Sequence, residues 1–209
     1  NKNELPENTP ITEFAIEKGR ITSVSKDVLP EKEQMNVFIN MFIMKKSLLQ
    51  NIVMDSVSHN RKHFMTDVIS DNLKSMKVYG YEHKGFYTGI TSLRAYYESN
   101  MSMLNPECRH ELFGDRSVFT KIRDSAPTKY GSCSSVVNSM IADGCEIEGQ
   151  VINRVLFRGV KVGPGAVVKD SILMQDTIVG NNANLTAVIT DKNVIISDRV
   201  NLMGCEQIP

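Results

Sequence analysis

Small and aliphatic residues recur at every sixth position in the segment from Arg158 to Gly180. The first series with this spacing consists of Val160, Ala166, Ile172 and Ile178. A second series, two positions further on, consists of Val162, Val168, Met174 and Gly180. An α-helix repeats about every 3.6 residues and a strand every two, so neither explains the spacing. Six residues on each of three faces per turn is the arrangement of a parallel β-helix, in which aliphatic side chains point inward.

A four-residue signature repeats at a longer interval and supports a solenoid. Its copies are NSMI from residue 138, NRVL from 153, DSIL from 170 and TAVI from 186, so the offsets are 15, 17 and 16 residues. A turn-like pair follows each copy, and these pairs are Asp143-Gly144, Arg158-Gly159, Gln175-Asp176 and Asp191-Lys192. Tight corners favour Gly, Asn and Asp. We therefore predict about four to five stacked coils over residues 136–209. The alternative is an ordinary antiparallel β-domain.

Residues 1–112 follow a different pattern, which predicts a mixed α/β region. The segment FAIEKGRITSV has a polar turn between two alternating stretches and indicates a β-hairpin. Further strands are expected at MNVFINMFIM (35–44) and MKVYGYEHKGFYTGI (76–90). Helices are expected at KKSLLQNIV (45–53), KHFMTDVISDNLK (62–74) and TSLRAYYESNMSML (91–104), the last with Thr91 or Ser92 as its N-cap. The chain then loses periodicity, and we interpret residues 113–135 as a linker and docking segment.

The composition narrows the class of partner. Hydrophobic residues make up 41% of the chain and charged residues 23%, and the formal net charge is zero. This balance gives no support for nucleic acid or a membrane as the main partner. No CxxC pair occurs among the cysteines Cys108, Cys133, Cys145 and Cys205, so a zinc site is not expected. They fit reduced, partly buried thiols in a cytoplasmic protein.

Hexapeptide solenoids occur in acyltransferases and in sugar nucleotidyltransferases, and the histidines separate the two groups. Acyltransferases commonly use a histidine of the solenoid as a base, but all four histidines here precede the repeats: His59, His63, His83 and His110. We expect His63 to be structural and Asp67, in FMTDVI, to be a carboxylate on a helix surface. An acyltransferase is therefore disfavoured.

Longer segments resemble a known family. SAPTKYG, NSMIADGCEIEGQVINRVLFRGVKVGPGAVVKDSILMQ, NVIISDRVNLMG and FYTGITSLRAYYESNMSML resemble the C-terminal half of bacterial glucose-1-phosphate adenylyltransferase, or ADP-glucose pyrophosphorylase. The resemblance covers essentially the whole chain, which we expect to be a fragment of a longer protein. It implies the C-terminal part of a nucleotidyltransferase (Rossmann-like) α/β domain, followed by an all-β domain, a left-handed parallel β-helix. The family reaction converts ATP and glucose 1-phosphate to ADP-glucose and pyrophosphate.

The resemblance also implies that three substrate contacts are altered. In FYTGITS (86–92), Gly89 stands where the family has the aspartate that holds Mg²⁺. Lys26 is only a vestigial counterpart of the lysine that grips the sugar phosphate. Phe38 and Asn40 replace a serine and a glycine that contact glucose. We therefore expect no catalytic residue, metal site or cofactor in this chain, and we expect Mg²⁺ to be bound by a catalytic partner.

These departures are what the resemblance leads us to expect of the second, GlgD-type subunit of the family. Its implied role is to regulate and assemble with a catalytic subunit in glycogen biosynthesis, in a hetero-oligomer such as a tetramer, or with itself. An anionic sugar-phosphate effector is expected at Arg123, Lys129, Arg158 and Lys161, near the domain junction. Solvated surface charge is the alternative for each of these side chains. The rival functions are a catalytically competent nucleotidyltransferase and a hexapeptide scaffold that binds no small molecule.

Overall fold

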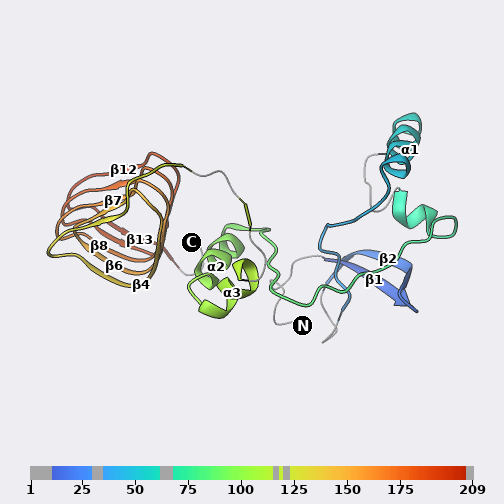
Figure 1. The fold of residues 1–209 in the computed structure, drawn as a ribbon, viewed down its shortest axis with the longest axis horizontal. Coiled ribbons are helices and arrows are strands. Elements are labelled where there is room, and N and C mark those ends of the chain that lie inside the picture. Colours follow the sequence, from blue (N-terminus) through green and yellow to red (C-terminus); the bar gives the residue numbers. More distant parts are fainter. Residues whose placement is uncertain (1–10, 30–34, 62–67, 115–117, 120–122, 206–209) are drawn as a thin grey trace. The chain divides into compact units, whose positions relative to one another are not determined.

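The computed structural model describes residues 11–29, 35–61, 68–114, 118–119 and 123–205, shown in Figure 1. The chain divides into two compact units, residues 1–84 and residues 85–209. The first is the mixed α/β region and the second contains a parallel β-solenoid, as the sequence pattern predicts. None of the helices among the described residues is long and apolar enough to cross a membrane.

A β-hairpin lies at the centre of the first unit. Strands β1 (Ile11–Glu17) and β2 (Arg20–Val28) pair antiparallel. The turn residues Lys18 and Gly19 have φ of 49° and 80°, which fits the two left-handed positions of a type I′ turn. The hairpin buries three large apolar side chains, Ile11, Phe14 and Ile21. The predicted hairpin is thus confirmed.

The two other predicted strands of this unit are wrong as strands. Val37 and Tyr79 form single bridges, one on each outer side of the hairpin, to Glu13 and Arg20. Asn40 has φ of 58°, which ends the extended backbone that pairs with β1. The apolar residues that follow it are exposed rather than buried: Met41, Phe42 and Ile43.

The helices of the first unit agree with the sequence in part. Helix α1 spans Lys46–Ser58, longer than predicted, and buries Ile52. The first part of the helix expected over residues 62–74 lies outside the described residues, and so do His63 and Asp67. Its described part forms helical turns over residues 68–72 and buries Val68 and Ile69.

Two helices precede the solenoid in the second unit. Helix α2 (Leu93–Ser102) begins at Ser92, whose hydroxyl accepts a hydrogen bond from the amide of Ala95 over 3.0 Å. Helix α3 (Pro106–Phe113) has Asn105 as its N-cap and Pro106 in its first turn. Arg109 of α3 donates to the carbonyls of Met103 and Leu104 after the end of α2. This contact ties the two helices together.

The solenoid is built from short parallel strands stacked in two sheets, visible in Figure 1. One sheet has the order β13-β10-β8-β6-β4, with β11 also paired to β8, and the other has the order β12-β9-β7-β5-β3. The strands are β3 (Lys129–Tyr130), β4 (Ser135–Ile141), β5 (Glu146–Ile147), β6 (Gln150–Leu156), β7 (Lys161–Val162), β8 (Val167–Leu173), β9 (Ile178–Val179), β10 (Asn184–Thr186), β11 (Ile189–Thr190), β12 (Ile195–Ile196) and β13 (Asn201–Met203).

Three corners per coil let the chain turn with left-handed backbone. Stacked positions with positive φ form three columns: Asn138, Asn153, Asp170 and Ala187; Gly144, Gly159, Asp176 and Asn193; and Gly165, Asn182 and Arg199. The amide of Asn138 donates to Asn153 fifteen residues on, and Asn153 donates to Asp170 seventeen residues on. The fourth signature therefore aligns at Ala187, one residue later than the predicted TAVI copy at 186.

The interior is a column of aliphatic side chains, but the six-residue spacing holds on only two faces. Successive interior residues Val162 and Val168 are six apart, whereas Leu173 follows after five. The expected inward position of Ile178 is therefore wrong, and its neighbour Val179 lies inside. The first solenoid strand, β3, lies within the segment interpreted as a linker, and the boundary between the compact units falls at Gly85 rather than after residue 112.

Candidate functional site

The loop that contains Gly89 leads directly into α2. Gly89 is half-buried, and its φ lies outside the left-handed range that would demand glycine. Among the described residues, a Cβ built at this position would meet the Tyr87 side chain alone, with the hydroxyl oxygen 3.3 Å away. The side chain of Thr88 shares a hydrogen bond of 2.6 Å with Ser99 of α2. Neither the backbone nor the available space therefore requires a glycine here.

The side chains around Gly89 do not fit a Mg²⁺ site. Magnesium ions prefer carboxylate and phosphate oxygens, and Gly89 supplies no side-chain oxygen. The neighbouring groups are the hydroxyls of Tyr87 and Thr88, and that of Thr88 is bound to Ser99. Within the described ranges, no group of three His, Cys, Asp or Glu side chains could hold a metal. We therefore assign no metal-dependent step to this loop.

The other altered positions lie in the first unit. Lys26 is exposed near the end of β2. The ring of Phe38 packs against Phe14, with 5.2 Å between ring centroids, so it serves the small core of this unit. Asn40 adopts the left-handed backbone that a glycine would also adopt. The substitution at position 40 thus keeps the backbone conformation while adding a polar side chain.

Two of the expected effector residues lie on one face of the solenoid with a carboxylate between them. Lys129, Glu146 and Lys161 are stacked in register on β3, β5 and β7. Lys161 Nζ lies 2.9 Å from Glu146 Oε1. The hydrogen bond and charge of Lys161, helped by Lys129, lower the pKa of the Glu146 carboxyl. An anion that binds both lysines would have to compete with Glu146.

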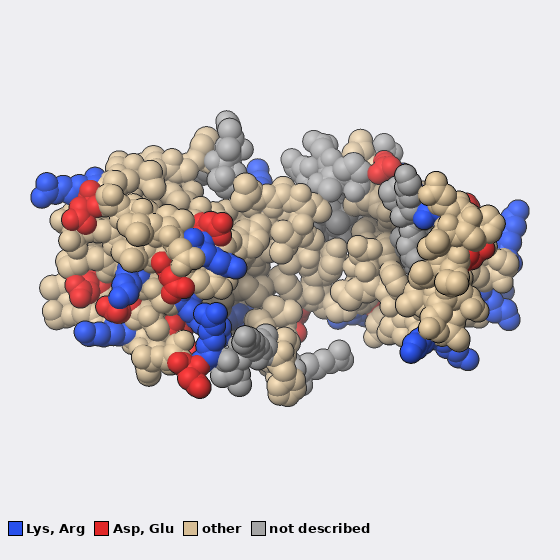
Figure 2. Space-filling view, turned by 90° about the horizontal axis from the view of Figure 1, so that it is seen from above, with Lys and Arg blue, Asp and Glu red and all other residues tan. Residues whose placement is uncertain are grey.

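The other two expected effector residues lie near a corner. Arg158 precedes the corner residue Gly159, and Arg123 is exposed ahead of the first coil. Asp143 lies one coil before Arg158 at the same corner, since the amide of Gly159 bonds to the Asp143 carbonyl. Figure 2 shows basic and acidic side chains interspersed over the solenoid. The structure thus brings Lys129 and Lys161 onto one face and places the other two apart from them, Arg158 at a corner and Arg123 ahead of the first coil.

A buried arginine in β6 was not singled out by the sequence pattern. Arg154 has no exposed surface, and in the described part of the chain its Nε, Nη1 and Nη2 atoms have no hydrogen-bond partner. Burial lowers its pKa to about 9, and the nearby charge of Asp170 opposes this shift. The residues paired with it in the neighbouring coils are Ser139 and Ser171. Because these are small and polar, the repeat pattern does not predict a large buried side chain at position 154. The side chain is charged at neutral pH and its burial is unfavourable.

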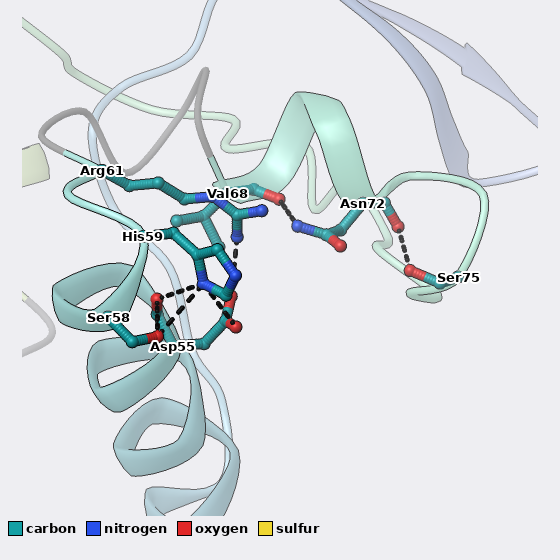
Figure 3. Close-up of polar contacts among 7 residues, drawn as sticks. All are labelled: Asp55, Ser58, His59, Arg61, Val68, Asn72 and Ser75. Carbon is teal, nitrogen blue, oxygen red and sulfur yellow. Dashed lines mark hydrogen bonds and ion pairs between the residues drawn. The ribbon is translucent and has the colours of Figure 1, made fainter.

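A Ser-His-Asp cluster at the end of α1 resembles a catalytic triad in composition but not in geometry (Figure 3). Ser58 Oγ lies 3.1 Å from His59 Nδ1, and Asp55 Oδ1 also lies 3.1 Å from that same nitrogen. A triad requires the serine and the carboxylate on opposite ring nitrogens. Arg61 further pairs with Asp55 over 2.7 Å. The cluster therefore closes the exposed end of a helix and cannot relay a proton from Ser58.

Comparison with known proteins places these features in a family. A family model described as "GlmU-like, C-terminal hexapeptide" matches residues 125–207. The glycogen biosynthesis protein GlgD of Bacillus subtilis is 33% identical over 174 residues, which cover 82% of this chain and 50% of that protein. A glucose-1-phosphate adenylyltransferase of Acetivibrio thermocellus is 31% identical over 178 residues, which cover 84% of this chain and 41% of that enzyme.

The chain belongs to the glucose-1-phosphate adenylyltransferase family. A third relative, the GlgD protein of Geobacillus stearothermophilus, is 39% identical over 131 residues, or 62% of this chain and 38% of that protein. The chain spans half or less of the length of these relatives. Members of both kinds, GlgD proteins and adenylyltransferases, are therefore similar to it.

Proposed function

We propose that this chain is part of a regulatory and assembly subunit of glucose-1-phosphate adenylyltransferase. The observation that carries the proposal is the loop at Gly89, where the resemblance leads us to expect a metal-binding aspartate. No backbone constraint explains the glycine, and no other carboxylate takes its place in the loop. The partner is a catalytic subunit, which binds Mg²⁺ and carries out the reaction in glycogen biosynthesis. Similarity to two GlgD proteins supports this role.

The second candidate is a catalytically competent member of the family. One observation favours it: Asn40 keeps the left-handed backbone, so the loop around this position retains its course. Similarity to adenylyltransferases also supports it. The two candidates differ in whether the protein makes ADP-glucose without a partner.

An anionic effector is part of the proposal, and Lys129 and Lys161 would bind it. Their separation by Glu146 makes a specific test available, because the carboxylate competes with any phosphate group. In the full-length protein, Glu146→Gln should strengthen binding of a sugar phosphate such as fructose 1,6-bisphosphate, measured by calorimetry, and Lys161→Gln should weaken it. Glu148→Gln, a neighbouring carboxylate outside this ladder, is the matched control. Equal affinity in all four proteins would remove these lysines from the effector site.

Assembly is tested by mixing the full-length protein with a catalytic glucose-1-phosphate adenylyltransferase subunit. Light scattering coupled to size separation should detect a complex heavier than either component, with both chains present in it. Two separate peaks at micromolar concentration would exclude the proposed partner.

A further inference from the structure

Helix α2 contacts the loop that contains Gly89. Ser99 of α2 donates its hydroxyl proton to the carbonyl of Ala95 over 2.5 Å. Because a hydroxyl has one proton, Thr88 is the donor in its 2.6 Å contact with Ser99. Thr88 is the immediate neighbour of Gly89, so this bond fastens the loop to the side of α2.

The other contact of α2 reaches the solenoid. Tyr97 donates its hydroxyl to the carbonyl oxygen of Asp170 over 2.9 Å. The Asp170 side chain accepts from Asn153, which in turn accepts from Asn138. Burial and the nearby Asp170 raise the pKa of Tyr97, so the hydroxyl remains a donor at neutral pH. One hydroxyl on α2 is thereby joined to a column of side chains that crosses three coils.

The surface beneath α2 is apolar, and a buried charge lies next to it in the chain. Val155 and Ile172 are buried although they lie outside the interior cluster, and α2 packs against β6. Arg154 lies next to Val155 in the chain and is fully buried without a hydrogen-bond partner among the described residues. An unpaired buried charge opposes folding of the region around it.

We propose that α2 is a coupling helix, which links the loop of residues 86–92 to the Asn138–Asn153–Asp170 corner column. The warrant is a continuous set of contacts: Thr88 to Ser99, the helix itself, and Tyr97 to Asp170. A change at the corner column changes the position or order of the loop, and coupling of this kind acts equally in both directions. A ligand or subunit that binds the solenoid would act on the Gly89 loop by this path.

The first test breaks the contact to the solenoid and observes the distant loop. Tyr97→Phe removes one hydroxyl and keeps the ring, and Tyr96→Phe on the same helix is the matched control. Hydrogen exchange of the Tyr96 amide, which bonds to the Ser92 carbonyl, should become about fivefold faster in Tyr97→Phe. The NMR order parameter of the Gly89 amide should fall in the same variant. Both signals should remain unchanged in the control.

The reverse test breaks the contact to the loop and observes the corner column. Thr88→Val should shift the side-chain amide signals of Asn153, although Thr88 does not contact that residue. The coupling is wrong if Tyr97→Phe leaves the order of Gly89 unchanged, or if Thr88→Val leaves the Asn153 signals in place. Chemical unfolding first establishes that each variant is folded. Because both tests use this chain alone, their result does not depend on the regulatory function proposed above.

Discussion

At the scale of single residues, the absence of a carboxylate at position 89 bears most directly on function. Glycine is often retained where the backbone is left-handed or closely approached by backbone, but Gly89 has no left-handed φ, and the atom that approaches it, among the described residues, is the end of the partly exposed Tyr87 side chain. The position could therefore accept the aspartate that the resemblance leads us to expect. The proposed role, in which the partner subunit binds the metal, accounts for the glycine without a structural requirement.

The substitution Gly89→Asp tests this interpretation. The free energy of unfolding should change by no more than about 0.5 kcal/mol, because the new side chain displaces only the partly exposed Tyr87. Chemical denaturation of the chain measures this quantity, with Gly159→Asp as a comparison at a corner that has φ of 71°. A loss of more than about 2 kcal/mol at position 89 would mean that glycine is structurally required there.

Arg154 gives a second prediction at this scale. Replacing a buried, unpaired guanidinium by an apolar side chain of similar length should stabilise the fold by about 1–4 kcal/mol. Arg154→Met is the variant, denaturant unfolding is the measurement, and Arg158→Met on the partly exposed corner should be nearly neutral. Destabilisation by Arg154→Met would show that the guanidinium has a partner in solution.

The stabilisation by Arg154→Met should also depend on pH. Burial lowers the pKa of Arg154 from its ordinary value to about 9, so above about pH 9 the unfolded chain binds more protons than the folded chain. The contribution of Arg154 to stability therefore rises with pH in this window. The advantage of the methionine variant should be constant from pH 6 to 8 and should shrink above about pH 9. An unchanged advantage at pH 10.5 would contradict the lowered pKa.

At the scale of elements, the solenoid was predictable because its signal repeats. Inward residues such as Val162 and Val168 recur along the chain, and each coil confirms the spacing of the previous one. The five-residue step from Val168 to Leu173 was not predicted, because we counted six residues on every face whereas one face of the coil has five. Helix α3 was missed although Asn105 and Pro106 form a recognisable helix start, since no apolar periodicity follows them.

The mixed α/β region was less predictable because its strands depend on neighbours distant in sequence. Val37 and Tyr79 each make one bridge to the hairpin, and sequence periodicity does not reveal where such a pairing ends. The candidate site shows the same limit. The register between coils creates both the Lys129–Glu146–Lys161 ladder and the buried position of Arg154. The offset between equivalent residues varies between 15 and 17, so the sequence alone does not show which side chains are stacked.

The corner columns yield a prediction for an element. Ala187 has φ of 53° in a column otherwise occupied by Asn138, Asn153 and Asp170. Left-handed backbone costs alanine about 1 kcal/mol, whereas asparagine adopts it readily and could donate to Asp170. Ala187→Asn should therefore raise the free energy of unfolding by about 1 kcal/mol. Ala187→Gly separates the backbone effect from the new hydrogen bond, and a loss of stability in both variants would contradict the assigned corner.

At the scale of the whole molecule, the chain consists of two units, residues 1–84 and 85–209, with different origins of stability. The solenoid has a continuous aliphatic interior, while the first unit buries few large side chains among its described residues. The proposed regulatory subunit would use the solenoid for assembly. Family membership is established, and the division of labour between subunits is the claim that requires testing.

The most direct test measures ADP-glucose formation from ATP and glucose 1-phosphate by the full-length protein, alone and mixed with a catalytic subunit. The account predicts no turnover by the protein alone, and higher or effector-shifted activity in the mixture than in the catalytic subunit by itself. An unrelated hexapeptide protein at the same concentration controls for nonspecific stabilisation of the enzyme. Substantial turnover by the protein alone would contradict the account, because it would mean that a site with Gly89, Phe38 and Asn40 still performs the reaction.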